Sequence, residues 1–486
     1  MKKFFNFVII ITTLISIVTC LYVALDTNKV ESGYELIWLQ PLVFAMVYLL
    51  ILRPIIKMNK FKITVFSVII LAWLRFILIP FFSVVSDVYN GIQYLIVSPE
   101  STQLAILISV YELFISSLFL YILSNLDFSQ TGAKLSSPPL ELTGKKSIYA
   151  LFIALAFILY LSVGRKLYII DLFVISADTT GSNIESTSFV LLSQIFKCGM
   201  VFFFVWFTSY CQQRHEKTGN IAYVYYPIIV AIVNVGIIVG ERRTEQVYTA
   251  FAVMFILTAA FKQHSRKIII SISAAAGTIL LFMSIYKHFG AYYYGSYANA
   301  LQASTINLEE ITKILQSYFF GTQNIASAIE FKQVADLNLL NMIYDFGRST
   351  FGFSFLLKGR MFMTTEYFNT YIYGFSKANG HVISGVGYGY MYLGALLSPL
   401  IACLNIFFAV QLEKWFYRTT SYELKYIVGY MLARFVTNVY VNTPPLISLS
   451  TNMLFTAGLI YFVARIFNTR TPLAVKIKSQ PLTHIT

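Results

Sequence analysis

Charged residues are scarce in this chain. Only 12% of its 486 residues are Asp, Glu, Lys or Arg, whereas 57% are hydrophobic and 17% are aromatic. So few charges cannot cover the surface of a water-soluble globule of this length. The mean hydropathy of +0.69 agrees with this view. The composition therefore predicts a membrane protein.

Cysteine is also rare, and its four copies have no metal-ligand spacing. They fall inside or at the edge of apolar runs, which excludes a disulfide framework and a zinc site: Cys20, Cys198, Cys211 and Cys403. The chain lacks Ser-His-Asp, His-Glu-x-x-His and Asp-x-Asp patterns, and it has no nucleotide fingerprint. We therefore expect no metal and no cofactor. The net charge of +14 is attributed to basic cytoplasmic loops, so no nucleic-acid partner is expected.

Long apolar runs dominate the rest of the sequence. About 20 apolar residues are needed to cross a bilayer as a helix. The runs lie at 4–25, 36–52, 63–82, 104–123, 147–164, 187–210, 221–240, 245–261, 268–285, 386–411, 424–441 and 446–467. The sequence thus predicts an all-α polytopic membrane protein with about twelve transmembrane helices and no separate soluble domain.

The basic residues set the orientation of these spans. The first run follows two lysines and is too long for a cleaved signal peptide, so we expect a signal anchor with its N-terminus inside. With alternating spans, 21 of the 36 basic residues lie inside and 12 outside. This bias matches the excess of Lys and Arg in cytoplasmic loops. Both termini are predicted to be cytoplasmic.

One connection is far longer than the others. It divides the chain into a membrane region with nine spans (1–285), a large extracytoplasmic loop (286–385), and a region with three spans and a cytoplasmic tail (386–486). Asn307 and Glu310 have the spacing of a helix-starting capping box. An apolar stripe follows on one face of that helix, at Ile311, Ile314, Leu315, Tyr318 and Phe319. We expect a helix lying along the membrane surface.

Four charged residues lie inside the predicted spans, where charges are costly and are functional candidates. At about 1.5 Å per residue, Arg75, Glu112, Lys197 and Arg434 all lie about 10–15 Å from the outer end of their spans. Arg75 and Glu112 lie at matching depths on consecutive spans, so we expect them to form a structural ion pair. Lys197 and Arg434 would then remain uncompensated, which indicates an outward-facing cavity suited to an anion.

A short outside turn adds further positive charge. Arg242 and Arg243 stand at the outer end of a span, against the usual charge bias. Guanidinium groups bind diphosphate oxygens in a bidentate way, so this turn is a candidate diphosphate site. The alternative is that Glu241 and Glu245 neutralise both arginines.

The long loop carries candidate acid-base groups. His381 precedes the tenth span, and its imidazole could act as a general base, although a lone histidine is more often a structural hydrogen-bonder. Asp345 is the second candidate. Arg348 and Arg360, which lie in the same loop, would help to bind the diphosphate.

Several short sequences give the chain a resemblance to a known family. They are Gly240-Glu-Arg-Arg-Thr, Trp73-Leu-Arg-Phe-Ile-Leu-Ile-Pro and Gly385-Val-Gly-Tyr-Gly-Tyr-Met-Tyr-Leu-Gly. Arg348 and Gly359 also have the spacing of an arginine followed eleven positions later by glycine. With one large outer loop near the C-terminal third, the chain resembles the O-antigen and capsule repeat-unit polymerases, the Wzy-type, GT-C-like membrane glycosyltransferases of bacteria.

The resemblance implies a reaction. A polymerase of surface polysaccharide transfers a growing glycan from undecaprenyl diphosphate to a lipid-linked repeat unit, at the outer face of the bacterial plasma membrane. The expected partners are undecaprenyl-diphosphate-linked oligosaccharide, the lipid bilayer, a chain-length regulator and a flippase. The chemistry needs a base and cations around the departing diphosphate. In many membrane glycosyltransferases that base is an early-loop carboxylate, which leaves three reserve candidates, Asp26, Glu31 and Glu35.

Three other functions stay open. A repeat-unit flippase or other transporter would usually show two related halves, short loops and charges near the midplane. Here nine spans precede the long loop and three follow it, and the charges lie in the outer half, which favours the enzyme. An O-antigen-ligase-like transferase and a lipid-binding structural protein are the remaining alternatives.

Overall fold

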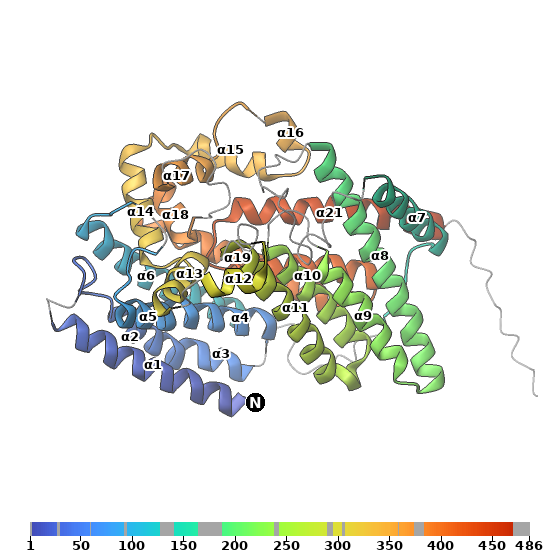
Figure 1. Cartoon of the computed structure of the whole chain (residues 1–486), viewed down its shortest axis with the longest axis horizontal. Coiled ribbons are helices and arrows are strands. Elements are labelled where there is room, and N and C mark those ends of the chain that lie inside the picture. The colour runs from blue at the N-terminus through green and yellow to red at the C-terminus, as the bar shows by residue number, and fades with distance from the viewer. Residues whose placement is uncertain are drawn as a thin grey trace, which may run out of the picture.

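The protein is helical throughout the part of the chain that the structure describes. This computed structural model describes residues 2–26, 30–58, 60–91, 95–126, 140–163, 187–237, 243–288, 295–303, 307–357, 359–373 and 383–469. Within these residues the secondary structure is α-helix with short π and 3₁₀ segments, and only isolated β-bridges occur. Figure 1 shows long helices running beside one another, with the shorter helices α15, α16 and α17 at the upper edge of the molecule.

The helices follow one another as the apolar runs predict. The first group is α1 (Lys2–Ala24), α2 (Leu39–Val47), η1 (Tyr48–Leu52), α3 (Arg53–Met58), α4 (Lys62–Trp73), η2 (Leu74–Leu78), α5 (Ile79–Ser86) and α6 (Pro99–Leu126). The second is α7 (Lys146–Val163), α8 (Thr187–Thr218), α9 (Ala222–Gly236), α10 (Arg243–Ala260), η5 (Lys262–His264) and α11 (Ser265–His288). The third is α12 (Tyr297–Ala303), α13 (Leu308–Phe319), α14 (Thr322–Val334), α15 (Leu339–Ser349), α16 (Phe353–Leu357) and α17 (Thr364–Tyr373). The last is α18 (Gly385–Leu397), α19 (Leu400–Arg418), α20 (Tyr422–Thr437) and α21 (Thr443–Thr469).

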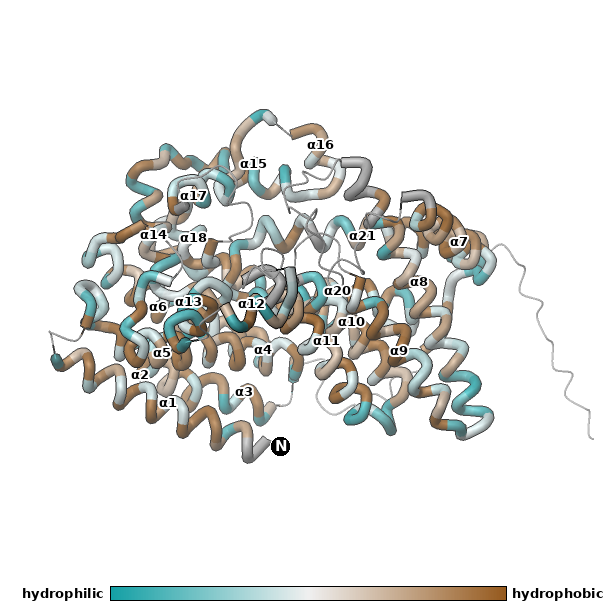
Figure 2. The backbone as a smooth tube through the Cα atoms, in the orientation of Figure 1, coloured by the Kyte–Doolittle hydropathy of each residue, from teal (hydrophilic) through white to brown (hydrophobic). Residues whose placement is uncertain are grey.

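Eight of the described helical stretches are long and apolar enough to cross a membrane, so the chain has the make-up of a multi-pass membrane protein. Seven of them match predicted spans, and the eighth, Leu400–Arg418, overlaps the second half of the predicted tenth span. Three of the other four fall on shorter apolar helices, Lys146–Leu161, Ala222–Gly236 and Glu245–Ala260. The fourth is α20, which has 16 residues. Figure 2 shows the hydrophobic residues running along the length of α1, α2 and α9.

The predicted tenth span, 386–411, is wrong as one continuous helix. α18 ends at Leu397 and α19 begins at Leu400, and Gly394 has φ +75° inside α18. The chain folds back over this break, because a Cβ added to Gly389 would lie 2.3 Å from the Ser398 carbonyl oxygen. The apolar run therefore holds two packed helices, and the glycines allow their close approach.

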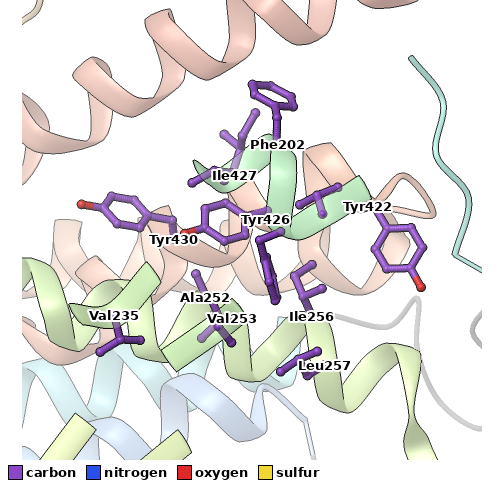
Figure 3. Packing of buried hydrophobic residues seen from close by; sticks show 14 of the residues in the cluster. Phe202, Val235, Ala252, Val253, Ile256, Leu257, Tyr422, Tyr426, Ile427 and Tyr430 are labelled. Atoms are coloured by element: carbon purple, nitrogen blue, oxygen red, sulfur yellow. The ribbon is translucent and has the colours of Figure 1, made fainter. Parts of the chain in front are cut away.

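Two large apolar cores hold the bundle together. One is formed by α7 to α11, α20 and α21, and Figure 3 shows Tyr426 and Tyr430 of α20 lying close to Ala252 and Val253 of α10. The other joins α1 to α4, with η1 and η2, to α6 and α19. Because α20 packs against α10, α19 and α21, most of its side chains are buried. Polar groups on α20 are consequently held away from solvent and lipid.

The helix predicted after Asn307 exists, and it begins where expected. The Asn307 side chain caps α13 by accepting a hydrogen bond from the Glu310 backbone N–H. Its polar face packs on α5, where the Thr312 hydroxyl lies 2.9 Å from that of Ser86. Part of the apolar stripe is exposed on the other side, at Ile311 and Tyr318. In the next helix, α14, most residues are buried and the helix packs against α6 and α18.

Candidate functional site

Arg434 is the most unusual charged residue of the described part of the chain. It lies near the C-terminal end of α20, is fully buried, and is one of the largest side chains with no exposure. None of its three guanidinium nitrogens has a hydrogen-bond partner among the described residues. An isolated buried charge is costly unless it is paired or hydrogen-bonded. Arg434 therefore has the properties expected of a group that binds an anion.

An aromatic ring lies against the Arg434 guanidinium. Its Cζ atom lies 4.7 Å from the centre of the Tyr248 ring, a cation–π contact. Tyr430, one helical turn before Arg434, packs edge-on against Tyr248 with ring centres 6.0 Å apart. The Asn438 side-chain amide donates to the Tyr248 hydroxyl over 2.6 Å and to the Arg434 carbonyl oxygen over 3.0 Å. These contacts fix the tyrosine ring but leave the guanidinium N–H groups unused.

Lys197 is not uncompensated, contrary to the sequence-based expectation. Its ammonium group on α8 forms a salt bridge with Glu245, in the first turn of α10. The sequence suggests Glu245 only as a partner for Arg242 and Arg243, because the depth of a residue along a span does not reveal which helices are neighbours. Of the four charged residues in the predicted spans, Arg434 is thus left as the buried cation without an anionic partner among the described residues, and Lys197 has a structural role.

The N-terminus of α10 lies beside these groups. Arg243 is the first residue of α10, two positions before Glu245 and five before Tyr248. Helix N-termini carry unpaired N–H groups and a positive dipole end, both of which favour anions. The backbone of Arg243 therefore begins the helix that contacts Arg434. The Arg243 side chain and the whole of Arg242 lie outside the described residues.

Arg75 and Glu112 form a second buried charged group, and here the structure brings together the two residues that matched in depth. Arg75 Nη1 donates to Glu112 Oε2 over 2.7 Å, and Arg75 Nε donates to the Phe320 carbonyl oxygen over 3.2 Å. The guanidinium also lies over the rings of Phe76 and Tyr440. Arg75 belongs to the π-helical segment η2, a type of segment that is frequent at functional sites. The pair ties η2 to α6, and Arg75 also holds Phe320, which lies between α13 and α14.

Asp345 has the contacts of a structural carboxylate. It is almost fully buried on α15, accepts a hydrogen bond from the Thr364 backbone N–H over 3.0 Å, and accepts another from the Tyr388 hydroxyl over 2.8 Å. Burial raises the pKa of Asp345, although these hydrogen bonds oppose the effect. Asp345 therefore caps α17 and ties it to α18. Its role as a base stays a prediction.

The remaining candidates are scattered. Arg348 is half-buried on α15 and Arg360 is exposed after α16, and no described contact joins either to Arg434. His381 lies outside the described residues. Of the reserve carboxylates, Glu31 accepts from the Asn90 amide, and Glu35 accepts from the Gly33 N–H and the Gln103 amide. Both therefore hold loops together.

Two buried carboxylates escaped the sequence analysis. Glu413 of α19 accepts hydrogen bonds from the N–H groups of Ile63 and Thr64, at the start of α4. Glu423 of α20 accepts from Gly144 N–H and from the Tyr149 hydroxyl, near the start of α7. In the sequence, the signal for these two residues is an acidic side chain at the end of an apolar run. Glu413 satisfies N–H groups in the first turn of α4, and Glu423 holds the loop before α7, so both carboxylates are structural.

Comparison with protein-family models, with curated proteins and with solved structures finds no match to this chain. Among the described residues, no cluster of His, Cys, Asp or Glu could hold a metal ion.

Proposed function

We propose that this protein polymerises a surface polysaccharide, by transferring a growing glycan from undecaprenyl diphosphate to a lipid-linked repeat unit at the outer face of a bacterial plasma membrane. The observation that carries the proposal is the fully buried guanidinium of Arg434, which has no hydrogen-bond partner among the residues that the structure describes. A departing lipid diphosphate is an anion of the kind that such a group binds. The resemblance of the sequence to repeat-unit polymerases supplies the reaction.

In this proposal Arg434 stabilises charge on the leaving diphosphate. The N–H groups of the guanidinium are unused in the described contacts, so diphosphate oxygens could accept bidentate hydrogen bonds from them. A fixed donor in a water-poor site stabilises developing charge without reorganisation. By their place in the sequence, just before and at the first residue of α10, Arg242 and Arg243 are proposed to add positive charge around the diphosphate. His381 is the proposed base for the acceptor hydroxyl.

A transporter is the second candidate, and the broken helix α18–α19 favours it. The start of α18 is buried beside the carboxylate of Glu112. A Cβ atom added to Gly385 would lie 3.4 Å from Oε1 of Glu112. Discontinuous helices with ends at the binding site are typical of secondary transporters. A transporter would bind the lipid-linked unit and release it unchanged, so product analysis separates the two candidates.

Binding of the lipid tests the role of Arg434 before any turnover. Undecaprenyl diphosphate should raise the melting temperature of the purified wild-type protein, because ligands that bind only the folded state stabilise it. Arg434→Ala should lose this shift. Arg418→Ala removes an exposed arginine at the end of α19 and serves as the matched control. Equal shifts for all three proteins would remove Arg434 from the site.

A further inference from the structure

The helices α15 and α16 expose an unusually apolar surface. In the segment 339–357 the charged residues are Asp345, which is buried, and Arg348, which is half-buried. Six large apolar side chains are instead 54–67% exposed: Leu339, Leu340, Ile343, Phe353, Phe355 and Leu356. Figure 1 shows α15 and α16 at the upper edge of the molecule, and Figure 2 shows hydrophobic residues along α16. Exposed apolar patches of this kind mark a binding or membrane surface.

The segment lies against a helix that can cross the membrane. The Phe351 N–H donates to the Thr451 hydroxyl over 3.1 Å, and the Phe351 ring lies 5.3 Å from the ring of Phe455. Both partners belong to α21, whose candidate span is 443–468. Thr451 and Phe455 lie about 12 and 18 Å along the helix from Thr443, at 1.5 Å per residue. A contact at that depth falls within a hydrocarbon core about 30 Å thick.

Two polar side chains of the segment, those of Tyr344 and Asp345, face the protein. The Tyr344 hydroxyl lies 2.9 Å from the Leu357 carbonyl oxygen and 2.7 Å from that of Met361, closing the turn between α15 and the residues after α16. The Asp345 carboxylate is hydrogen-bonded inward to Thr364 and Tyr388. Non-spanning backbone at membrane depth requires its polar groups to be satisfied within the protein.

The exposed surface of α21 continues that of the segment. Leu454, Phe455 and Leu459 of α21 are 40–64% exposed on a helix that would face acyl chains. Phe455 packs on Phe351 and is itself half-exposed, so the two apolar surfaces meet there. A protein partner would be expected to find charged or polar groups at the rim of its site. The continuity with a candidate span favours lipid.

We infer that the segment 339–357 is embedded in the bilayer, in the half nearest the Thr443 end of α21, with its apolar face against lipid acyl chains. The connection 286–385 thus contributes to the membrane domain as well as to the water-exposed surface. This inference does not depend on the enzymatic proposal.

Collision accessibility of nitroxide labels tests the inference. Single cysteines at Ile343 and Leu356 are labelled in the full-length protein, reconstituted in vesicles of phosphatidylethanolamine and phosphatidylglycerol. Both labels should relax faster with oxygen, which partitions into acyl chains, than with a water-soluble nickel chelate. A label at Glu309, exposed at the start of α13, should show the opposite preference. The four native cysteines are buried, which limits background labelling.

Two outcomes would overturn the inference. Preference for the nickel chelate at both Ile343 and Leu356 would place the segment in water. Poor access of both reagents would mean that a protein, either a partner or a second copy of this chain, covers the surface. A second readout protects against a label that disturbs folding: a fluorophore at either position should be quenched by lipids brominated along the acyl chain, and the Glu309 fluorophore should not.

Discussion

The guanidinium of Arg75, on η2, donates a hydrogen bond to the carboxylate of Glu112, on α6, and both side chains are almost completely buried. Breaking such a pair leaves one buried charge without its partner, which typically costs about 3–5 kcal/mol. We therefore expect Glu112→Ala to lower the melting temperature of the purified protein strongly. The double variant Arg75→Met, Glu112→Leu should recover most of the loss, because it removes both charges together.

A surface pair provides the control for that experiment. Lys313 and Glu310 form an exposed salt bridge of 2.9 Å on α13, and such pairs contribute about 1 kcal/mol or less. Glu310→Ala should hardly change the melting temperature. If Glu112→Ala melted like Glu310→Ala, the Arg75–Glu112 pair would not be an important structural element.

Arg434 should behave in the opposite way to a structural residue. Because its buried charge has no anionic partner in the described residues, Arg434→Met should make the ligand-free protein more stable, by about 1 kcal/mol or more. The melting temperature without added lipid measures this effect, with Arg418→Met as the control. A large loss of stability would indicate that Arg434 holds the fold together instead.

Asp345 should tolerate replacement by asparagine. An amide can still accept from Thr364 N–H and can donate to the Tyr388 oxygen, and it avoids burying a charge. Since burial raises the pKa of Asp345, the folded state favours the proton, and stability falls as the pH rises from the ordinary aspartate pKa toward the raised one. The variant should lack this fall in its unfolding curves. Loss of chain growth in a stable Asp345→Asn protein would instead support the base role.

The sequence predicts much of the membrane map, for reasons visible in particular elements. Apolar runs mark where helices lie, because hydrophobic length is a property of the local chain, and the Asn307 cap of α13 is likewise local. The sequence does not predict the break between α18 and α19, because both helices are apolar and the turn falls inside one apolar run. The sequence does not predict the Lys197–Glu245 pair, because the pair depends on how α8 and α10 pack. Helix packing is a tertiary property that hydropathy does not encode.

Orientation follows from the charge bias and can be checked in intact cells. A cysteine replacing Lys313 on α13 should react with an impermeant thiol reagent from outside, whereas one replacing Lys145, which is exposed before α7, should not. Both positions should react after the cells are permeabilised. The reverse pattern in intact cells would overturn the predicted orientation of both loops.

Chain growth by the purified protein tests the central claim most directly. Undecaprenyl-diphosphate-linked repeat units are supplied without nucleotide sugars, and the products are separated by length. We expect the wild-type protein and Arg418→Ala to build polymers. Arg434→Ala should slow growth by ten-fold or more, because loss of a charge-assisted hydrogen bond costs about 1.5–3 kcal/mol. Repeat units that remain unjoined with folded wild-type protein, or equal growth by Arg434→Ala, would contradict the account.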